Sequence, residues 1–369
     1  MNKGLTSFRA LAFFAIFLFH IGSCKGGYIG VLAFFVLSGF LLTPILVDMK
    51  SSLNKRDFFT HFYGRRALRI FPLYYSYLVI VATISFFAIS KYGHFIPMNE
   101  SIFANLDVFI ESLPWTLTYT YNFFHASKYF EGTRLATHFW SLAIEEQFYL
   151  VWPLAIFFIP ANHLKRFLLS VIVAGPLIRL LLAVILDANM FPVLPETDLV
   201  IYVLPFSHVD AFAIGGYFSL YVKSRPGYLV WASILPVFML GMITDWLSTS
   251  QIHWNQLGYG MFMKDSYKYV WGYSAVNLMF SYMLVHVRDK TFMPVFFGNP
   301  LLVYLGTISY GLYVFHFPIL WMVNNMVPSY PEVVRILMTL LITIMVSAVS
   351  YEFMEKKIIR LKDKYFSRY

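Results

Sequence analysis

Long apolar segments alternate with short polar segments along the whole chain. A helix needs about 20 apolar residues to cross a bilayer. Ten segments approach this length, at 5–21, 29–48, 71–90, 139–159, 166–186, 199–221, 228–247, 271–287, 300–323 and 333–353. The pattern therefore predicts an all-α fold, a polytopic transmembrane helical bundle of about ten spans.

Composition supports the same class of protein. Of 369 residues, 59% are hydrophobic, 20% are aromatic and only 13% are charged, whereas a soluble domain carries roughly twice that share of charge. The mean hydropathy is +0.64. The single cysteine, Cys24, excludes an internal disulfide framework and any cysteine-built metal site, and we expect no bound metal.

The positive charge is sorted between alternate loops. The formal net charge is +9, and roughly 20 of the Lys and Arg residues fall on one side of the predicted membrane, which the positive-inside rule assigns to the cytoplasm. Both termini are then cytoplasmic, with a basic segment at 49–70, an outer loop at 91–138 and a basic tail at 355–369. We interpret the charge as a topology signal and an attraction to membrane lipid, not as nucleic-acid binding. The expectation is one integral-membrane domain, 1–369, in the cell inner (plasma) membrane.

The first predicted span carries Arg9 and ends at His20. Eleven residues at about 100° each return to nearly the same helix face, with a rise of roughly 16 Å. A long anionic substrate along this face would be held at one end and react at the other. Two alternatives stand beside this hypothesis. Arg9 snorkels to the headgroups while His20 lies at the interface, or a lipoprotein-like box at 21–24 is cleaved and both residues are lost.

A second polar cluster opens the predicted span at 139–159. Ser141, Glu145 and Tyr149 share one helix face at i, i+4 and i+8, whereas Glu146 points elsewhere. These side chains either hydrogen-bond across a helix bundle or take part in catalysis. We weigh the two interpretations equally for Glu145 and favour helix contacts for Glu146.

Other polar residues are weaker candidates singly. Arg66 and Arg69, three residues apart before the third predicted span, form a fork suited to phosphate or to lipid headgroups. Ser38 and Gly39 lie within the second span and suit close helix packing. Asp210 follows His208 by two residues in an apolar segment and needs a partner. His316 reads as a structural histidine.

In their order along the chain, these stretches resemble the acyltransferase-3 family of integral-membrane O-acyltransferases. The matching segments are Leu5 to His20, Gly30 to Leu41, Arg66 to Pro72, His138 to Pro153 and Leu305 to Pro318, with Glu355 after the last span. The sequence departs from the family pattern at two positions. Position 32 is often charged in the family and is Leu32 here, and position 208 is often arginine and is His208 here. We expect a stand-alone membrane domain, without the hydrolase-like domain that some members of the family append.

The resemblance implies transfer of an acyl group, usually acetyl, from cytoplasmic acyl-CoA to a hydroxyl of an envelope carbohydrate. Acetyl-CoA is then a co-substrate and no cofactor is permanently bound. Arg9, Arg66, Arg69 and Ser38 are expected to hold the acyl-CoA. His20 acts as general base, with Glu145 or Asp210 holding its tautomer. The candidates for the acceptor pocket are His138, Trp140 and His316.

Two alternatives stay open. Within the same reaction, His20 is instead a nucleophile that forms an acyl-histidine. In a different class, the intramembrane charges form the proton relay of a secondary transporter or a lipid-linked glycan flippase. The absence of paired, interrupted spans in two similar halves and the presence of the Arg66–Arg69 fork favour the enzyme.

Overall fold

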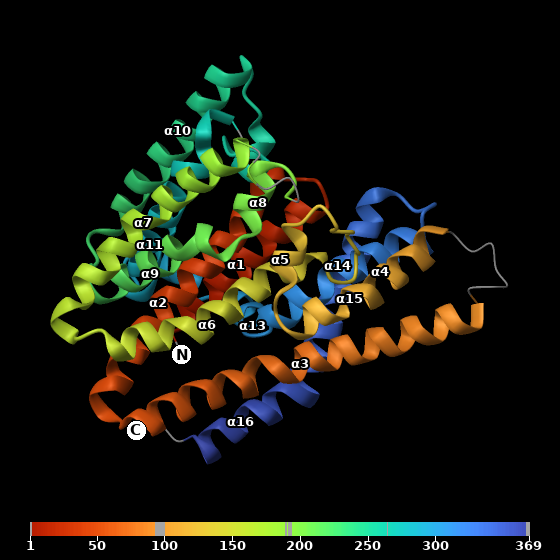
Figure 1. The fold of residues 1–369 in the computed structure, drawn as a ribbon, viewed down its shortest axis with the longest axis horizontal. Helices are drawn as coiled ribbons and strands as arrows, with labels where there is room; N and C mark the ends of the chain where they lie inside the picture. Colours follow the sequence, from red (N-terminus) through yellow and green to blue (C-terminus); the bar gives the residue numbers. More distant parts are fainter. Residues whose placement is uncertain (1, 93–99, 189, 191–193, 264, 367–369) are drawn as a thin grey trace. The chain divides into compact units, whose positions relative to one another are not determined.

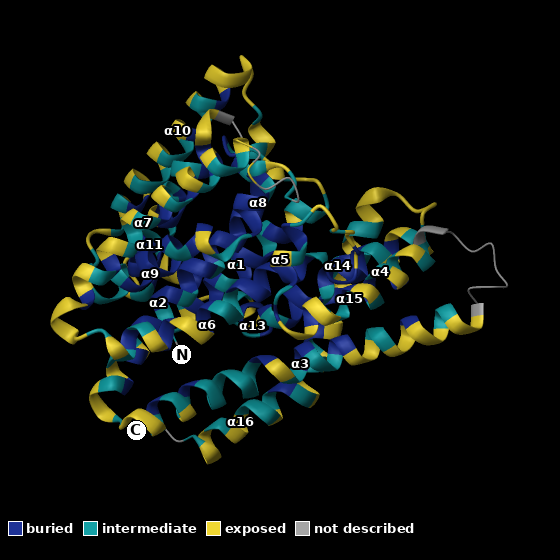
Figure 2. Ribbon diagram, in the orientation of Figure 1, coloured by how far each residue is buried: buried dark blue, intermediate teal, exposed yellow. Residues whose placement is uncertain are grey.

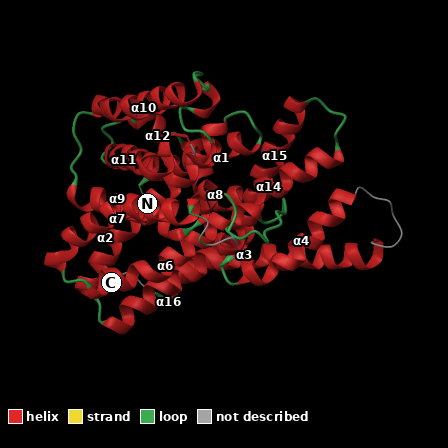
Figure 3. Ribbon diagram, turned by 45° about the horizontal axis from the view of Figure 1, so that its top comes forward, coloured by secondary structure: helices red, strands yellow, loops and turns green. Residues whose placement is uncertain are grey.

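The computed structural model describes residues 2–92, 100–188, 190, 194–263 and 265–366 (Figure 1). All regular elements in these ranges are helices, and Figure 3 shows helices joined by loops. The predicted all-α fold is confirmed.

Contacts divide the chain into two compact units. The first unit comprises Met1–Ser51 and Leu150–Ser309, and the second comprises Ser52–Tyr149 and Tyr310–Tyr369. Helix α6 (Trp140–Phe158) begins in the second unit and ends in the first. The interpretation of residues 1–369 as one domain stays a prediction beside this division.

The first unit is built around α1. Its helices are α1 (Lys3–His20), α2 (Ile29–Ser52), α7 (Ala161–Asp187), α8 (Thr197–Val203), α9 (Val209–Tyr221), α10 (Trp231–Thr249), α11 (Lys268–Arg288), α12 (Pro294–Phe297) and α13 (Pro300–Thr307). Helix α1 packs most extensively on α13, where a Cβ on Gly306 would lie 1.8 Å from the Thr6 carbonyl oxygen. Only glycine permits this backbone approach. Helices α7, α9 and α11 pack against one another beside it (Figure 1).

The second unit is built on one long helix. Its helices are α3 (Lys55–Tyr92), α4 (Glu100–Leu117), α5 (Tyr121–His125), α14 (Ser309–Met326), α15 (Glu332–Ser350) and α16 (Lys356–Tyr365), with the π-helical turn η8 (Tyr351–Glu355) joining the last two. Helix α3 has 38 residues and is therefore about 57 Å long, well beyond the hydrocarbon thickness of a bilayer. Helices α4 and α16 both pack on it.

The predicted count of ten spans is not confirmed. In the described residues, six helices are long and apolar enough to cross a membrane, and two broken pairs, α8 with α9 and α13 with α14, raise the number to eight. The predicted spans at 139–159 and 271–287 do form helices, α6 and α11, but neither belongs to this group. Both contain polar residues, including Glu145 and Glu146 in α6 and Asn277 in α11. The predicted outer loop, 91–138, is largely helical because it contains α4 and α5.

Exposed apolar side chains mark the helix faces that would contact lipid. Figure 2 shows exposed residues along the second half of α3 and on α10, and on α3 they include Val79, Ile80, Ile84, Phe86 and Phe87, which are 57–66% exposed. In water such faces would be unfavourable by about 25 cal/mol per Å² of apolar surface, whereas hydrocarbon tails accommodate them. The chain is a multi-pass membrane protein.

Candidate active site

The predicted site residues are divided between the two units. Arg9, His20, Ser38 and Asp210 belong to the first unit, and Arg66, Arg69, His138, Trp140, Glu145 and His316 belong to the second. The pairing of His20 with Glu145, which would join the two units, stays a prediction.

Arg9 and His20 lie on one unbroken helix. Helix α1 runs from Lys3 to His20, so the eleven-residue spacing applies without interruption, and both side chains are half-buried. His20 is the last helical residue. The chain then turns through Gly22, whose φ of 78° favours glycine, and Gly27 packs against the Ala15 carbonyl of α1. The structure therefore places the imidazole at the end of α1, beside a tight reversal of the chain.

Ser38 lies in α2 next to a backbone contact. A Cβ on the following residue, Gly39, would lie 2.0 Å from the carbonyl oxygen of Phe212 in α9. This contact confirms the close helix packing that the Ser-Gly pair suggested. Ser38 itself is half-buried, and its role in binding acyl-CoA stays a prediction.

Asp210 forms a buried ion pair with Arg179, a partner that was not predicted from the sequence. Its two carboxylate oxygens each accept a hydrogen bond from Arg179 of α7 at 2.9 Å, and Ser274 of α11 donates a third at 2.5 Å. Arg179 also donates to the carbonyls of Ser207 and Val270. Both charged side chains are fully buried. The signal for this pair was Arg179, an arginine in the middle of the apolar segment 166–186.

In the second unit, Arg66 and Glu145 are linked through an aromatic ring. The Arg66 guanidinium carbon lies 5.1 Å from the centroid of the Tyr149 ring and 5.8 Å from that of Phe62. Tyr149 Oη donates to Glu145 Oε2 at 3.3 Å, which confirms the expected i, i+4 pair. Arg66 also interacts electrostatically with both Glu145 and Glu146.

Arg69 extends the same polar cluster. It interacts electrostatically with Arg66 and with Glu355 in η8, so the two arginines do lie near one another as the spacing predicted. Glu355 is buried and accepts a hydrogen bond from Ser350 at 3.0 Å. The cluster therefore brings two guanidinium groups and three carboxylates together in the second unit. Such a cluster binds an anion only through the arginine edges that the carboxylates leave open.

His138, Trp140 and His316 are all buried. The Nε2 of His138 lies 3.1 Å from the Val314 carbonyl oxygen, and the Nδ1 of His316 lies 2.7 Å from that of Tyr313. Tyr313 Oη donates to the His138 carbonyl at 2.8 Å and also contacts the Ser141 hydroxyl at 2.5 Å. These contacts indicate a structural role for both histidines, and their contact with an acceptor stays a prediction.

Helix packing also explains Gln147, two residues after Glu145. The side-chain amide of Gln147 donates to the Tyr119 carbonyl and to Asn122 Oδ1, both at 2.8 Å. It thereby joins α6 to α5 within the second unit. Within the described residues, no group of three or more His, Cys, Asp or Glu side chains is placed to hold a metal ion.

Comparison with known proteins identifies relatives of the whole chain. A family model described as an acyltransferase domain matches residues 2–353. The O-acetyltransferase OatA of Staphylococcus aureus (strain NCTC 8325 / PS 47) is 27% identical over 377 residues, covering 99% of this chain and 58% of the relative. The peptidoglycan O-acetyltransferase OatA of Listeria monocytogenes is 26% identical over 381 residues, covering 95% of this chain and 54% of the relative. The chain thus spans little more than half the length of these relatives. No solved structure matches it.

Proposed function

The chain belongs to this acyltransferase family, and from that membership we propose that it transfers an acyl group, acetyl above all, from cytoplasmic acyl-CoA to a hydroxyl of a cell-envelope carbohydrate. Both relatives are named O-acetyltransferases, which supports acetyl as the group, and the name of the Listeria relative includes peptidoglycan, which supports an envelope polymer as the acceptor. The observation that carries the proposal is α1, a single helix with a cation near its start and an imidazole at its end.

The donor would be held by arginines. Arg9 on α1, and Arg66 with Arg69 on α3, supply guanidinium groups for the phosphates of CoA. Stacking on Tyr149 and Phe62 uses the faces of the Arg66 guanidinium and leaves N–H donors at its edge. Ser38 would contact the thinner pantetheine arm. In this arrangement the thioester reaches the far leaflet while the nucleotide stays at the cytoplasmic surface.

His20 would act as general base. Its Nδ1 or Nε2 accepts the proton of the acceptor hydroxyl as that oxygen attacks the thioester carbonyl. The tetrahedral intermediate then expels the CoA thiolate, which recovers the proton from the imidazolium, and the products are an ester and free CoA. Glu145 would stabilise the imidazolium. Asp210 already pairs with Arg179, so its charge is balanced without His20.

Acyl-CoA binding tests the proposal directly. Purified protein should bind acetyl-CoA, and Arg66→Ala with Arg69→Ala should weaken binding at least tenfold because two phosphate contacts are lost. Lys357→Ala with Arg360→Ala removes two exposed charges from α16 and is the matched control, which should bind normally. His20→Ala should bind acetyl-CoA, but envelope carbohydrate from cells that carry this variant should contain no alkali-labile acetate ester. Normal acetylation by His20→Ala would refute the assigned role.

The acyl-histidine mechanism predicts a different time course for the release of free CoA. If His20 is the nucleophile, acetyl-CoA without acceptor gives a burst of free CoA equal to the enzyme concentration, and His20→Ala abolishes it. If His20 is only a base, no such burst occurs.

A secondary transporter is the second candidate, and one structural observation favours it. From sequence we expected no paired, interrupted spans in two similar halves, whereas the described residues contain two broken pairs: α8 with η3–α9 (Thr197–Val203 and Pro205–Tyr221), bent by 70°, and α13 with α14, bent by 72°. Broken helices near buried charges are typical of transporters. Substrate flux that continues when acetyl-CoA is neither bound nor consumed would favour this function over the enzyme.

A further inference from the structure

The exposed face of the last long helix changes from apolar to cationic near its end. Helix α15, the turn η8 and α16 follow one another directly and form one helical segment, Glu332–Tyr365. Its exposed apolar side chains recur every four residues, at Val333, Leu337, Leu341, Met345, Val349 and Phe353. The next position with this spacing is Lys357, which is also exposed. The face that would contact lipid tails along α15 therefore continues into a cationic face on α16 within about one helical turn.

Three cations make up this basic face, Lys357, Arg360 and Lys364. Their spacing of i, i+3 and i+7 places them within about 60° of one another around the helix, and all three are exposed. Within the part of the chain that the structure describes, none of the three forms an ion pair. Lys356, by contrast, pairs with Glu352 at 2.6 Å. The basic face therefore keeps its positive charge toward the surroundings of the protein.

The one carboxylate of α16 belongs to the side that packs on α3. Asp363 lies about 120° around the helix from Lys357, and it forms an ion pair with Arg65 of α3 at 3.6 Å. Arg65 also donates a hydrogen bond to the Phe366 carbonyl. A Cβ on Gly64 of α3 would lie 2.2 Å from the Phe366 ring. Helix α3 thus holds one side of α16, and the basic face lies away from this contact.

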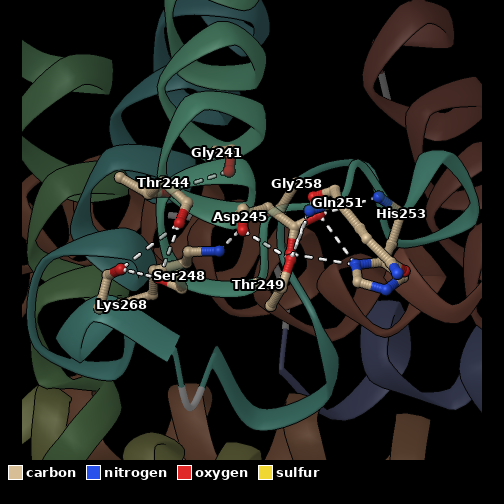
Figure 4. A network of polar contacts seen from close by, with 10 residues as sticks. Gly241, Thr244, Asp245, Ser248, Thr249, Gln251, His253, Gly258 and Lys268 are labelled. Atoms are coloured by element: carbon tan, nitrogen blue, oxygen red, sulfur yellow. Dashed lines mark hydrogen bonds and ion pairs between the residues drawn. The ribbon is translucent and has the colours of Figure 1, made fainter.

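Polar groups in the connection between α10 and α11 are instead matched within the protein (Figure 4). The buried Asp245 carboxylate accepts the backbone N–H of His253 at 2.9 Å and lies 3.1 Å from its Nδ1. Lys268 donates to the Gly258 carbonyl at 3.0 Å. Because these groups are hydrogen-bonded to one another, the network needs no ligand. The cations of the basic face have no such arrangement of acceptors around them in the described residues.

Exposed apolar side chains border the basic face. Leu361 and Tyr365 lie beside the cations and are exposed, and the Lys364 Nζ lies 5.4 Å from the centroid of the Tyr365 ring. Lysine and arginine combined with such apolar groups are typical of helices at a membrane surface. Along the helix axis, Lys357 lies about 6 Å and Lys364 about 16 Å beyond Phe353. Their long side chains can reach back to the headgroups.

We propose that the basic face binds the headgroups of anionic phospholipids, so that α16 is an interfacial helix of the leaflet where α15 ends. Cations at a membrane surface are attracted to anionic lipid, and three of them act together here. The phosphates of CoA share this chemistry, but lipid is favoured as the partner because the basic face continues the lipid-facing side of α15. This lipid binding is independent of the acyl transfer proposed above.

Nanodiscs of defined lipid composition test this binding on the full-length protein. In a Cys24→Ser background, Leu361→Cys carries an environment-sensitive fluorophore beside the basic face. Acrylamide, an uncharged quencher in the water phase, should quench this probe at least threefold less in discs that contain phosphatidylglycerol than in discs of phosphatidylcholine alone. Raising the salt concentration should remove most of this difference, because salt screens exposed charges.

Charge-matched variants locate the binding. Lys357→Gln with Arg360→Gln and Lys364→Gln should abolish the difference between the two kinds of disc. A control variant lowers the charge equally at exposed positions of the first unit and should keep the full difference. This control combines Arg166→Gln, Lys223→Gln and Arg225→Gln. Thermal unfolding shows whether each variant is folded, and the comparison of lipids in the labelled protein needs no change to the basic face.

Three results would overturn the assignment. Equal quenching in the two kinds of disc would show that the basic face does not bind anionic lipid. A difference that persists in the triple variant of α16 would place the lipid contact elsewhere. If acetyl-CoA in discs of phosphatidylcholine alone protects the probe as well as phosphatidylglycerol does, the basic face binds nucleotide phosphates instead of lipid. The first two results leave the proposed acyl transfer unaffected.

Discussion

The role assigned to the buried carboxylate of Asp210 changes once its ion-pair partner is known. From sequence it was a candidate to support His20, because an isolated carboxylate in an apolar segment needs a reason. The structure supplies that reason in Arg179, which forms a bidentate pair with it. The arginine comes from α7, some thirty positions earlier in the chain, so local sequence around His208 did not reveal it.

Replacing one member of this ion pair should lower the stability of the protein more than replacing both. Asp210→Asn leaves the Arg179 charge buried without its counter-charge, and we expect a loss of about 3–5 kcal/mol in the free energy of unfolding. Arg179→Met with Asp210→Leu should recover most of that loss, as measured by thermal unfolding in detergent. A double variant that folds but transfers no acetyl group would instead support the catalytic role predicted for Asp210.

His125 gives the second unit a dependence on pH. Burial lowers the pKa of His125 to about 4, and its ring stacks on Phe130 with centroids 3.9 Å apart. The unfolded chain, with a pKa near 6.5, binds the proton more readily. Stability is therefore full above pH 6.5 and is lost as the pH falls toward 4, by up to about 3 kcal/mol.

The His125→Phe variant tests this pH dependence. It keeps a ring against Phe130 but cannot bind a proton, so its melting temperature should change less between pH 7 and pH 4.5 than that of the wild type. Equal pH dependence of the two proteins would contradict the assignment to His125.

At the scale of helices, apolar segments predicted the positions well. Each of the ten predicted segments coincides with a helix, or with a broken pair of helices, in the structure. Helix α4 was missed because Asp107 and Glu111 interrupt its apolar residues, so it reads as a loop. The same limit applies to the site. The Glu145–Tyr149 bond follows from i, i+4 spacing, whereas the contact of Ser141 with Tyr313 joins helices distant in sequence.

The crossing of α2 and α9 depends on glycine. Gly39 faces the Phe212 backbone, and Gly215 faces the Val36 carbonyl at 2.1 Å from an added Cβ. Gly39→Ala should therefore push the helices apart and cost about 1–3 kcal/mol, seen as a lower melting temperature. Gly132→Ala is the matched control, since its added Cβ would meet nothing closer than 3.4 Å. Equal melting temperatures of the two variants would contradict this contact.

At the scale of the whole chain, composition and charge predicted a multi-pass membrane protein, but not its division into two units. That division depends on contacts between segments far apart in the sequence, such as 1–51 with 150–309. Hydropathy describes each segment against lipid and carries no information on which segments pack together.

The single cysteine offers a test of the predicted orientation. Cys24 is free and half-buried in the turn after α1, so a membrane-impermeant maleimide should label it in intact protoplasts if the N-terminus is cytoplasmic. In a Cys24→Ser background, Lys357→Cys on α16 should be labelled only after lysis. The reverse pattern would overturn the orientation.

Because α1 is unbroken, it fixes both the direction in which the His20 imidazole points around the helix and its distance from Arg9 along the helix. One residue inserted between Arg9 and His20 would turn the imidazole by about 100° yet lengthen the helix by only about 1.5 Å. Seven inserted residues would restore the direction within about 20° and add about 10 Å. The first insertion misaligns the reacting group with any donor, whereas the second keeps the alignment and calls for a donor with a longer arm. The length of α1 can therefore change without misaligning His20 only in steps of about whole helical turns.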